Sequence, residues 1–129
     1  MLFMMALVFN SCNNKEQIYT ITDYYIENYK NMGVEEVQKL INDDRNDCLG
    51  TKLILSKYDD SIMLRILSGK THIAKEISDM AYKKINNNLY TLDERNYSYE
   101  LFFKGNKIIV KEIVKTENDL TIVFVLTKD

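Results

Sequence analysis

The C-terminal third of the chain alternates apolar and polar residues, and this pattern limits what the chain can fold into. Short turns containing Gly, Asn or Asp separate apolar runs of strand length. Strands that are joined by turns this short pair in antiparallel fashion, so the sequence predicts an antiparallel β-meander. The predicted strands are Leu89–Leu92, Tyr97–Lys104, Lys107–Lys115 and Leu120–Thr127.

One position interrupts the apolar face of the third predicted strand. Ile108, Val110 and Val114 share that face, and Glu112 falls on it with them. A carboxyl group on an apolar face can have a raised pKa and act as a base. It can also mark a strand end, a bulge or a lysine partner, and both interpretations stay open.

The N-terminal half contains the spacing of helices. Ile18, Ile21 and Tyr25 recur at steps of three and four, which predicts a helix over Glu16–Met32 that ends at Gly33. A second short helix is predicted over Val34–Ile41. A polar loop over Asn42–Gly50 is expected to follow it.

The middle of the chain allows two interpretations. Thr51–Tyr58 and Ser61–Leu67 flank an acidic turn, which favours a β-hairpin, with a helix over His72–Asn86 after it. The alternative is one long helix over Ser61–Asn87. Ser68-Gly69 would interrupt that long helix, and this favours the hairpin.

The first twelve residues form an uncharged apolar segment that ends at a cysteine. Leu2–Phe9 is too short for a transmembrane helix, which needs about 20 residues, but it suits the apolar core of a signal peptide. Phe9-Asn10-Ser11-Cys12 resembles the lipobox of bacterial lipoproteins, in the variant typical of Bacteroidetes. Ser11 and Cys12 match the pattern, whereas Phe9 and Asn10 replace its commoner residues.

This resemblance implies an address rather than an activity. Residues 1–11 would be removed, Cys12 would carry the lipid, residues 12–16 would form a tether, and residues 17–129 would form one domain. The chain would then be anchored in the bacterial cell envelope, facing the periplasm or the cell surface. The alternative is an apolar N-terminal strand or turn packed on the domain. Without acylation, an oxidising compartment would permit a Cys12–Cys48 disulfide.

Composition and motifs exclude several classes of function. A net charge of −2 gives no electrostatic case for nucleic-acid binding. Gly69-Lys70-Thr71 resembles the end of a phosphate-binding P-loop, but Leu64 stands where that motif needs its first glycine. The acidic loop around Asp44 does not have the spacing of an EF-hand. The sequence therefore predicts no cofactor and no metal.

Two further groups of residues remain as candidates. Cys48 and His72 could pair as nucleophile and base, but no residues around Cys48 match a cysteine-protease signature, so a helix-capping or surface role is the favoured interpretation of His72. Tyr19 and Tyr24 fall outside the expected buried stripe of the first helix, so they are predicted as exposed contacts for a protein partner.

These observations predict an α+β domain with N-terminal helices packed on a C-terminal antiparallel meander. That order of elements resembles the cone of cystatin-like and nuclear-transport-factor-like folds. The function expected first is that of a non-catalytic lipoprotein that binds a partner, such as an inhibitor, an immunity-type protein or an accessory factor. The alternative is a small-ligand or weakly catalytic pocket in the curved sheet, lined by Glu112, His72 or a tyrosine hydroxyl.

Overall fold

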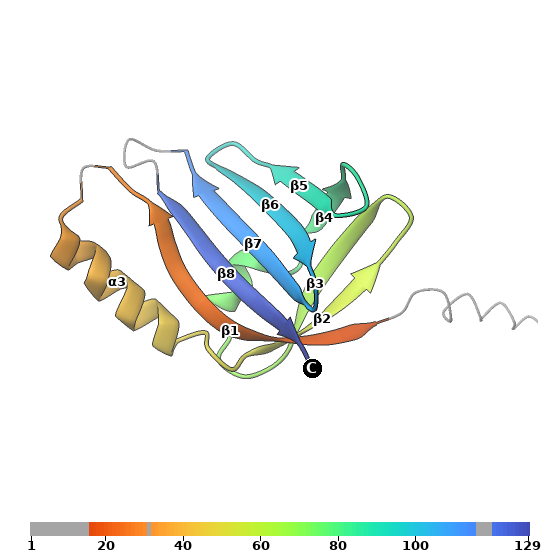
Figure 1. The fold of residues 1–129 in the computed structure, drawn as a ribbon, viewed down its shortest axis with the longest axis horizontal. Helices are drawn as coiled ribbons and strands as arrows, with labels where there is room; N and C mark the ends of the chain where they lie inside the picture. Colours follow the sequence, from red (N-terminus) through yellow and green to blue (C-terminus); the bar gives the residue numbers. More distant parts are fainter. Residues whose placement is uncertain (1–15, 31, 116–119) are drawn as a thin grey trace, which may run out of the picture.

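The computed structural model describes residues 16–30, 32–115 and 120–129, and these residues form a closed antiparallel β-barrel (Figure 1). The elements in this part of the chain are β1 (Gln17–Asn28), α3 (Val34–Asn46), β2 (Lys52–Lys57), β3 (Ser61–Ser68), the 3₁₀ helix η1 (Ala74–Ile77), β4 (Ala81–Lys84), β5 (Leu89–Asp93), β6 (Tyr97–Lys104), β7 (Lys107–Val114) and β8 (Thr121–Lys128).

Each strand pairs with the next one along the chain, and β8 returns to pair with β1. This arrangement is an up-and-down barrel, which leaves no sheet edge open. The predicted α+β cone with two N-terminal helices is therefore wrong. A single sheet closes on itself, and α3 is the one α-helix among the described residues.

The first predicted helix is strand β1, and a β-bulge explains the error. The register against β8 shifts between Ile21 and Asp23. The extra residue moves the inward face from Tyr19 and Ile21 to Tyr24 and Ile26. The bulge thus breaks the period-two alternation that would have indicated a strand. The helical spacing of Ile18, Ile21 and Tyr25 mixes two faces, because Ile21 is buried whereas Ile18 and Tyr25 are exposed.

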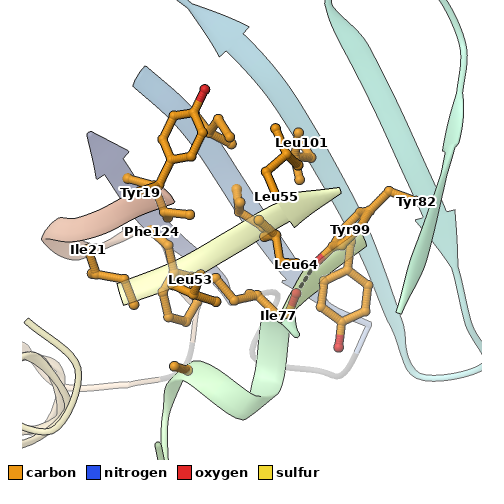
Figure 2. Close-up of a cluster of buried hydrophobic side chains, with 14 of the residues drawn as sticks. Tyr19, Ile21, Leu53, Leu55, Leu64, Ile77, Tyr82, Tyr99, Leu101 and Phe124 are labelled. Atoms are coloured by element: carbon orange, nitrogen blue, oxygen red, sulfur yellow. Dashed lines mark hydrogen bonds between the residues drawn. The ribbon is translucent and has the colours of Figure 1, made fainter. Parts of the chain in front are cut away.

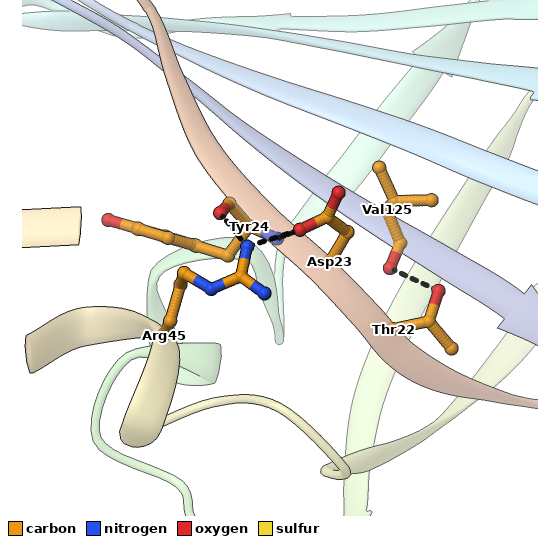
Figure 3. A network of polar contacts seen from close by, with 5 residues as sticks. All are labelled: Thr22, Asp23, Tyr24, Arg45 and Val125. Atoms are coloured by element: carbon orange, nitrogen blue, oxygen red, sulfur yellow. Dashed lines mark hydrogen bonds and ion pairs between the residues drawn. The ribbon is translucent and has the colours of Figure 1, made fainter. Parts of the chain in front are cut away.

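Helix α3 follows β1 and lies along it (Figure 1). The Glu36 carboxylate accepts a hydrogen bond from the Gly33 N–H at the helix start, and Val37 is the residue of the helix that is buried. The helix continues to Asn46, so the loop predicted over Asn42–Gly50 is largely helical. At its C-terminal end Arg45 binds the Asp23 carboxylate and the Tyr24 carbonyl oxygen, which ties α3 to β1 (Figure 3).

The connection between β3 and β4 packs into the barrel. Its residues Ile73, Ala74 and Ile77 are buried and join the core cluster. The helix predicted over His72–Asn86 is therefore wrong beyond the short η1. From Ala81 the chain is a strand, because Tyr82 pairs with Ile62 of β3 and these backbone hydrogen bonds outweigh local helical spacing.

The barrel interior is filled by side chains. An eight-stranded barrel is just wide enough for its inward residues to meet. The largest fully buried side chains include Tyr24 and Ile108, together with six that Figure 2 labels: Tyr82, Phe124, Leu53, Leu55, Leu64 and Leu101. The Tyr24 and Phe124 rings meet edge to face, with their centroids 5.1 Å apart. Each such aliphatic side chain stabilises the fold by roughly 1.5–3 kcal/mol through burial.

The predictions for the hairpin and the C-terminal strands are confirmed. Strands β2 and β3 pair as a hairpin, which excludes the single long helix over Ser61–Asn87. Strands β5 to β8 begin and end within about a residue of the predicted bounds. No helix in the described ranges has the length and apolar character that a bilayer crossing requires.

Candidate functional site

A pocket of about 350 Å³ lies where η1 meets strands β6, β7 and β8. Polar and apolar side chains share its walls. They are Glu76, Tyr97, Tyr99, Glu112, Val114 and Ile122. We call this pocket the barrel mouth. Its strand residues stand at the start of β6, the end of β7 and the start of β8, which are neighbours in the sheet.

Glu112 lies inside the barrel mouth and is 3% exposed. Its neighbours on the inward face of β7 are Val110 and Val114, as the alternation predicted. The Tyr99 hydroxyl on β6 donates a hydrogen bond of 3.1 Å to Glu112 Oε2. A carboxyl group is seldom buried unless it is paired, and this hydrogen bond supplies the partner that a buried carboxyl group requires.

The second carboxyl group of the barrel mouth comes from η1. Glu76 and Glu112 both line the barrel mouth, although much of Glu76 is exposed to solvent. Burial, followed by the negative charge of Glu76, raises the pKa of Glu112 to about 8. Desolvation also raises the pKa of Glu76. Because Glu112 is the more deeply buried of the two, we assign to it the proton that the pair shares near neutral pH.

Tyrosine rings form one wall of the barrel mouth. Tyr97 and Tyr99 are two residues apart on β6, and their rings stack with centroids 6.4 Å apart at 29°. Tyr99 also meets Tyr82 edge to face at 6.2 Å, as Figure 2 shows. The Tyr82 hydroxyl donates a hydrogen bond of 2.7 Å to the Ile77 carbonyl oxygen, which fastens η1 beneath the rings (Figure 2).

Tyr19 and Tyr24, which the sequence predicted to be exposed contacts, lie inside the barrel. They are 4% and 1% exposed. The Tyr24 hydroxyl donates to Asp44 Oδ2 of α3 at 2.9 Å. The predicted exposure is therefore wrong, because Tyr19 and Tyr24 both lie on the inward face of strand β1.

Cys48 and His72 do not have the properties of a nucleophile and its base. Cys48 is fully buried, and burial raises the pKa of its thiol to about 12, which disfavours the reactive thiolate. His72 is exposed and is not a lining residue of the barrel mouth. The expectation that His72 would line a pocket in the sheet is not met at this site.

Gly69-Lys70-Thr71 has a structural role. A side chain at Gly69 would come within 2.8 Å of the Thr51 Cα, and Gly69 has a φ of +108°. The Thr51 hydroxyl donates to the Lys70 carbonyl oxygen, and Lys70 Nζ donates to the Asn46 carbonyl oxygen at the end of α3. The tripeptide therefore holds the β3 end against the α3–β2 connection.

The acidic stretch around Asp44 belongs to α3 and contacts β1. Among residues 16–30, 32–115 and 120–129, no cluster of three or more histidine, cysteine or carboxylate side chains could hold a metal ion. Cys12, the predicted site of lipidation, lies outside the described residues.

Sequence reasoning identified Glu112 but missed Glu76. Period-two alternation was sufficient to place Glu112 on an apolar face. Glu76 reaches the site only because the β3–β4 connection folds over the barrel, and no local pattern encodes that path. The sequence signal was the apolar pair Ile73 and Ile77, which indicates that this connection packs on the core, as the burial of both residues shows.

Comparison with known proteins gives little further guidance. No family model and no solved structure matches this chain. One similar protein is described as "Putative type I restriction enzyme MjaVIIIP endonuclease subunit" from Methanocaldococcus jannaschii; it is 28% identical over 116 residues, which is 88% of this chain. The chain spans about 10% of that relative's length. No family is established by a match of this kind.

Proposed function

We propose that this protein is a non-catalytic binding protein that takes a small ligand into the barrel mouth. The observation that supports the proposal most strongly is the buried carboxyl group of Glu112, held by Tyr99 inside a pocket of about 350 Å³. Ligand pockets are concave, mostly apolar and contain a few converging polar groups, and the mouths of β-barrels are a usual place for them.

The free-energy cost of burying the Glu112 carboxyl group supports a functional role for this residue. Replacing Glu112 by an apolar residue would remove a desolvated acid from the barrel, where the neighbouring inward residue Val110 is fully buried. Positions that violate the local packing rules of a fold are the positions where function is expected. Glu112 is such a position in strand β7.

The second candidate function is binding of a protein partner through exposed tyrosines. Its two predicted rings, Tyr19 and Tyr24, are in the core. Among the exposed tyrosines, Tyr25 and Tyr29 lie on β1 and just after it, Tyr58 follows β2, and Tyr97 belongs to the barrel mouth itself. We therefore place the ligand in the barrel mouth.

The cellular address proposed for the protein follows from its first residues. Phe9-Asn10-Ser11-Cys12 supports lipidation at Cys12 and anchoring in a bacterial envelope. Strand β1 begins at Gln17, so residues 12–16 would tether the barrel close to the membrane. Metabolic palmitate labelling and intact mass of wild type and Cys12→Ala test this. Wild type without label, and with Met1 retained, would contradict it.

The binding proposal is tested by nuclear magnetic resonance with the barrel protein labelled with ¹⁵N. Small amines, carboxylates, sugars and alcohols are titrated as separate panels. The proposal expects at least one compound to shift the amide signals of Tyr97, Tyr99, Glu112 and Val114 more than those of the outward residues Lys104 and Glu100. If no compound from any panel does so, the barrel mouth is not a ligand site.

A further inference from the structure

We propose that the ligand of the barrel mouth is a small organic cation, in which a protonated amine is attached to a short apolar group. This inference rests on the binding function proposed above and specifies its chemistry. It depends on three features of the barrel mouth, which are the sign of the surrounding charge, the aromatic wall and the apolar floor.

The charges around the barrel mouth are mostly negative. Glu112 comes from β7 and Glu76 from η1. Asp44 of α3 raises the pKa of Glu76, and Glu94 of the β5–β6 turn raises the pKa of Tyr99. His72 opposes them beside Glu76. Such a field attracts a cation and repels an anion.

Within the described residues, neither Glu112 nor Glu76 forms an ion pair with a lysine or an arginine. The ion pairs there use other acids. Lys111, the residue before Glu112 on β7, pairs with Glu27, and Lys115, just past the end of β7, is engaged by Asp93 and the Glu94 carbonyl oxygen. Glu112 instead meets the Tyr99 hydroxyl and the second acid, Glu76. A buried acid that has another acid as its neighbour can gain from an external cation, because opposite charge favours the ionised form.

The walls fit an amine that carries a small apolar group. The stacked rings of Tyr97 and Tyr99 present aromatic surface, to which ammonium groups bind through cation–π attraction. Val114 and the buried Ile122 supply apolar contact on the other strands. The volume of about 350 Å³ is near the lower end of the range for ligand pockets, so the ligand is small.

Binding of an ammonium ion changes the protonation of Glu112. Near neutral pH the Glu112 carboxyl group is protonated, and an ammonium ion that binds beside it favours the carboxylate. The Glu112 proton is released to solvent, and the ammonium keeps its own protons. Binding therefore strengthens as pH rises toward the pKa of Glu112, as long as the amine of the ligand stays protonated.

Three four-carbon probes separate charge from shape: butylammonium, butanol and butyrate. Each is titrated into wild type, Glu112→Gln and Glu100→Gln, and the shifts of the amide signals in the barrel mouth are followed. Glu112→Gln keeps an acceptor for Tyr99 and nearly the same shape. Glu100→Gln is the matched control, since Glu100 lies on the outer face of the adjacent strand β6.

The inference predicts saturable binding of butylammonium by wild type and by Glu100→Gln, and binding at least about tenfold weaker by Glu112→Gln, the loss expected for one charge-assisted hydrogen bond. Butanol that binds as tightly as butylammonium, tighter binding of butyrate, equal binding by Glu112→Gln, or no binding of any probe would each overturn the cation assignment. Binding of a sugar or an alcohol at the barrel mouth would then still support the proposed ligand-binding function. If no compound of any panel binds there, both the cation assignment and the proposed function are wrong.

Discussion

Tyr99 and Glu112 face each other across the β6–β7 ladder, and the tyrosine hydroxyl donates a hydrogen bond of 3.1 Å to the carboxyl group inside the barrel. The pair occupies adjacent strands at one register position, so the backbone hydrogen bonds of the sheet fix its geometry. The hydrogen bond stabilises an acid in an otherwise apolar barrel, and it gives the barrel mouth its polar group.

Replacing Glu112 by glutamine is expected to stabilise the fold at alkaline pH. The pKa of Glu112 is raised in the folded protein, so the folded state binds the proton more tightly than the unfolded state does. Wild-type stability therefore falls as pH rises from the ordinary glutamate range toward about 8, by at most about 1.4 kcal/mol per pH unit. In urea unfolding from pH 5 to pH 9, the free energy of unfolding of Glu112→Gln should increase relative to that of wild type as pH rises. A difference independent of pH would contradict this.

Removing the Tyr99 hydroxyl is expected to raise the pKa of Glu112 further. The hydrogen bond from Tyr99 favours the ionised carboxylate and lowers the pKa of Glu112, whereas burial and the charge of Glu76 raise it. In Tyr99→Phe only the two effects that raise the pKa remain. Titration of the ¹³C signal of the Glu112 carboxyl group measures the change. Tyr97→Phe is the control, because it alters the neighbouring ring and keeps the Tyr99–Glu112 hydrogen bond. An unchanged or lower midpoint in Tyr99→Phe would refute the prediction.

Tyr82→Phe is expected to loosen the attachment of η1. The Tyr82 ring and Ile77 are both fully buried, and the hydroxyl donates to the Ile77 carbonyl oxygen. Loss of the donor leaves a buried acceptor unsatisfied, at a cost of about 1–3 kcal/mol in the free energy of unfolding. Hydrogen exchange at Lys75 to Ser78 should accelerate. Tyr58→Phe, which alters a ring that is 52% exposed, should change neither quantity.

Gly69→Ala is expected to destabilise the barrel through its backbone. A Cβ there would lie 2.8 Å from the Thr51 Cα, and the φ of +108° disfavours any L side chain. A cost of about 1–3 kcal/mol follows, since backbone has to move. Gly33→Ala, at a φ of −73° and with only the Glu36 side chain nearby, should cost less. Equal melting temperatures for the two variants would count against this account.

The sequence was informative where the inward face follows an uninterrupted alternation. Strands β6 and β7 alternate regularly, so Glu112 could be placed on an apolar face. The sequence did not reveal strand β1, because the bulge shifts its inward face by one residue and interrupts the alternation. The predicted exposure of Tyr19 and Tyr24 was wrong for the same reason. The β4 strand and Glu76 were missed because barrel closure and the path of η1 depend on contacts between residues distant in the chain.

The most direct measurement of the central claim is the titration of the Glu112 carboxyl group by ¹³C magnetic resonance, with and without butylammonium. The account predicts a midpoint near pH 8 in the free protein. In the presence of the cation the midpoint should fall by about one unit or more, as a neighbouring opposite charge requires. A midpoint in the ordinary glutamate range that is the same with and without butylammonium would contradict it.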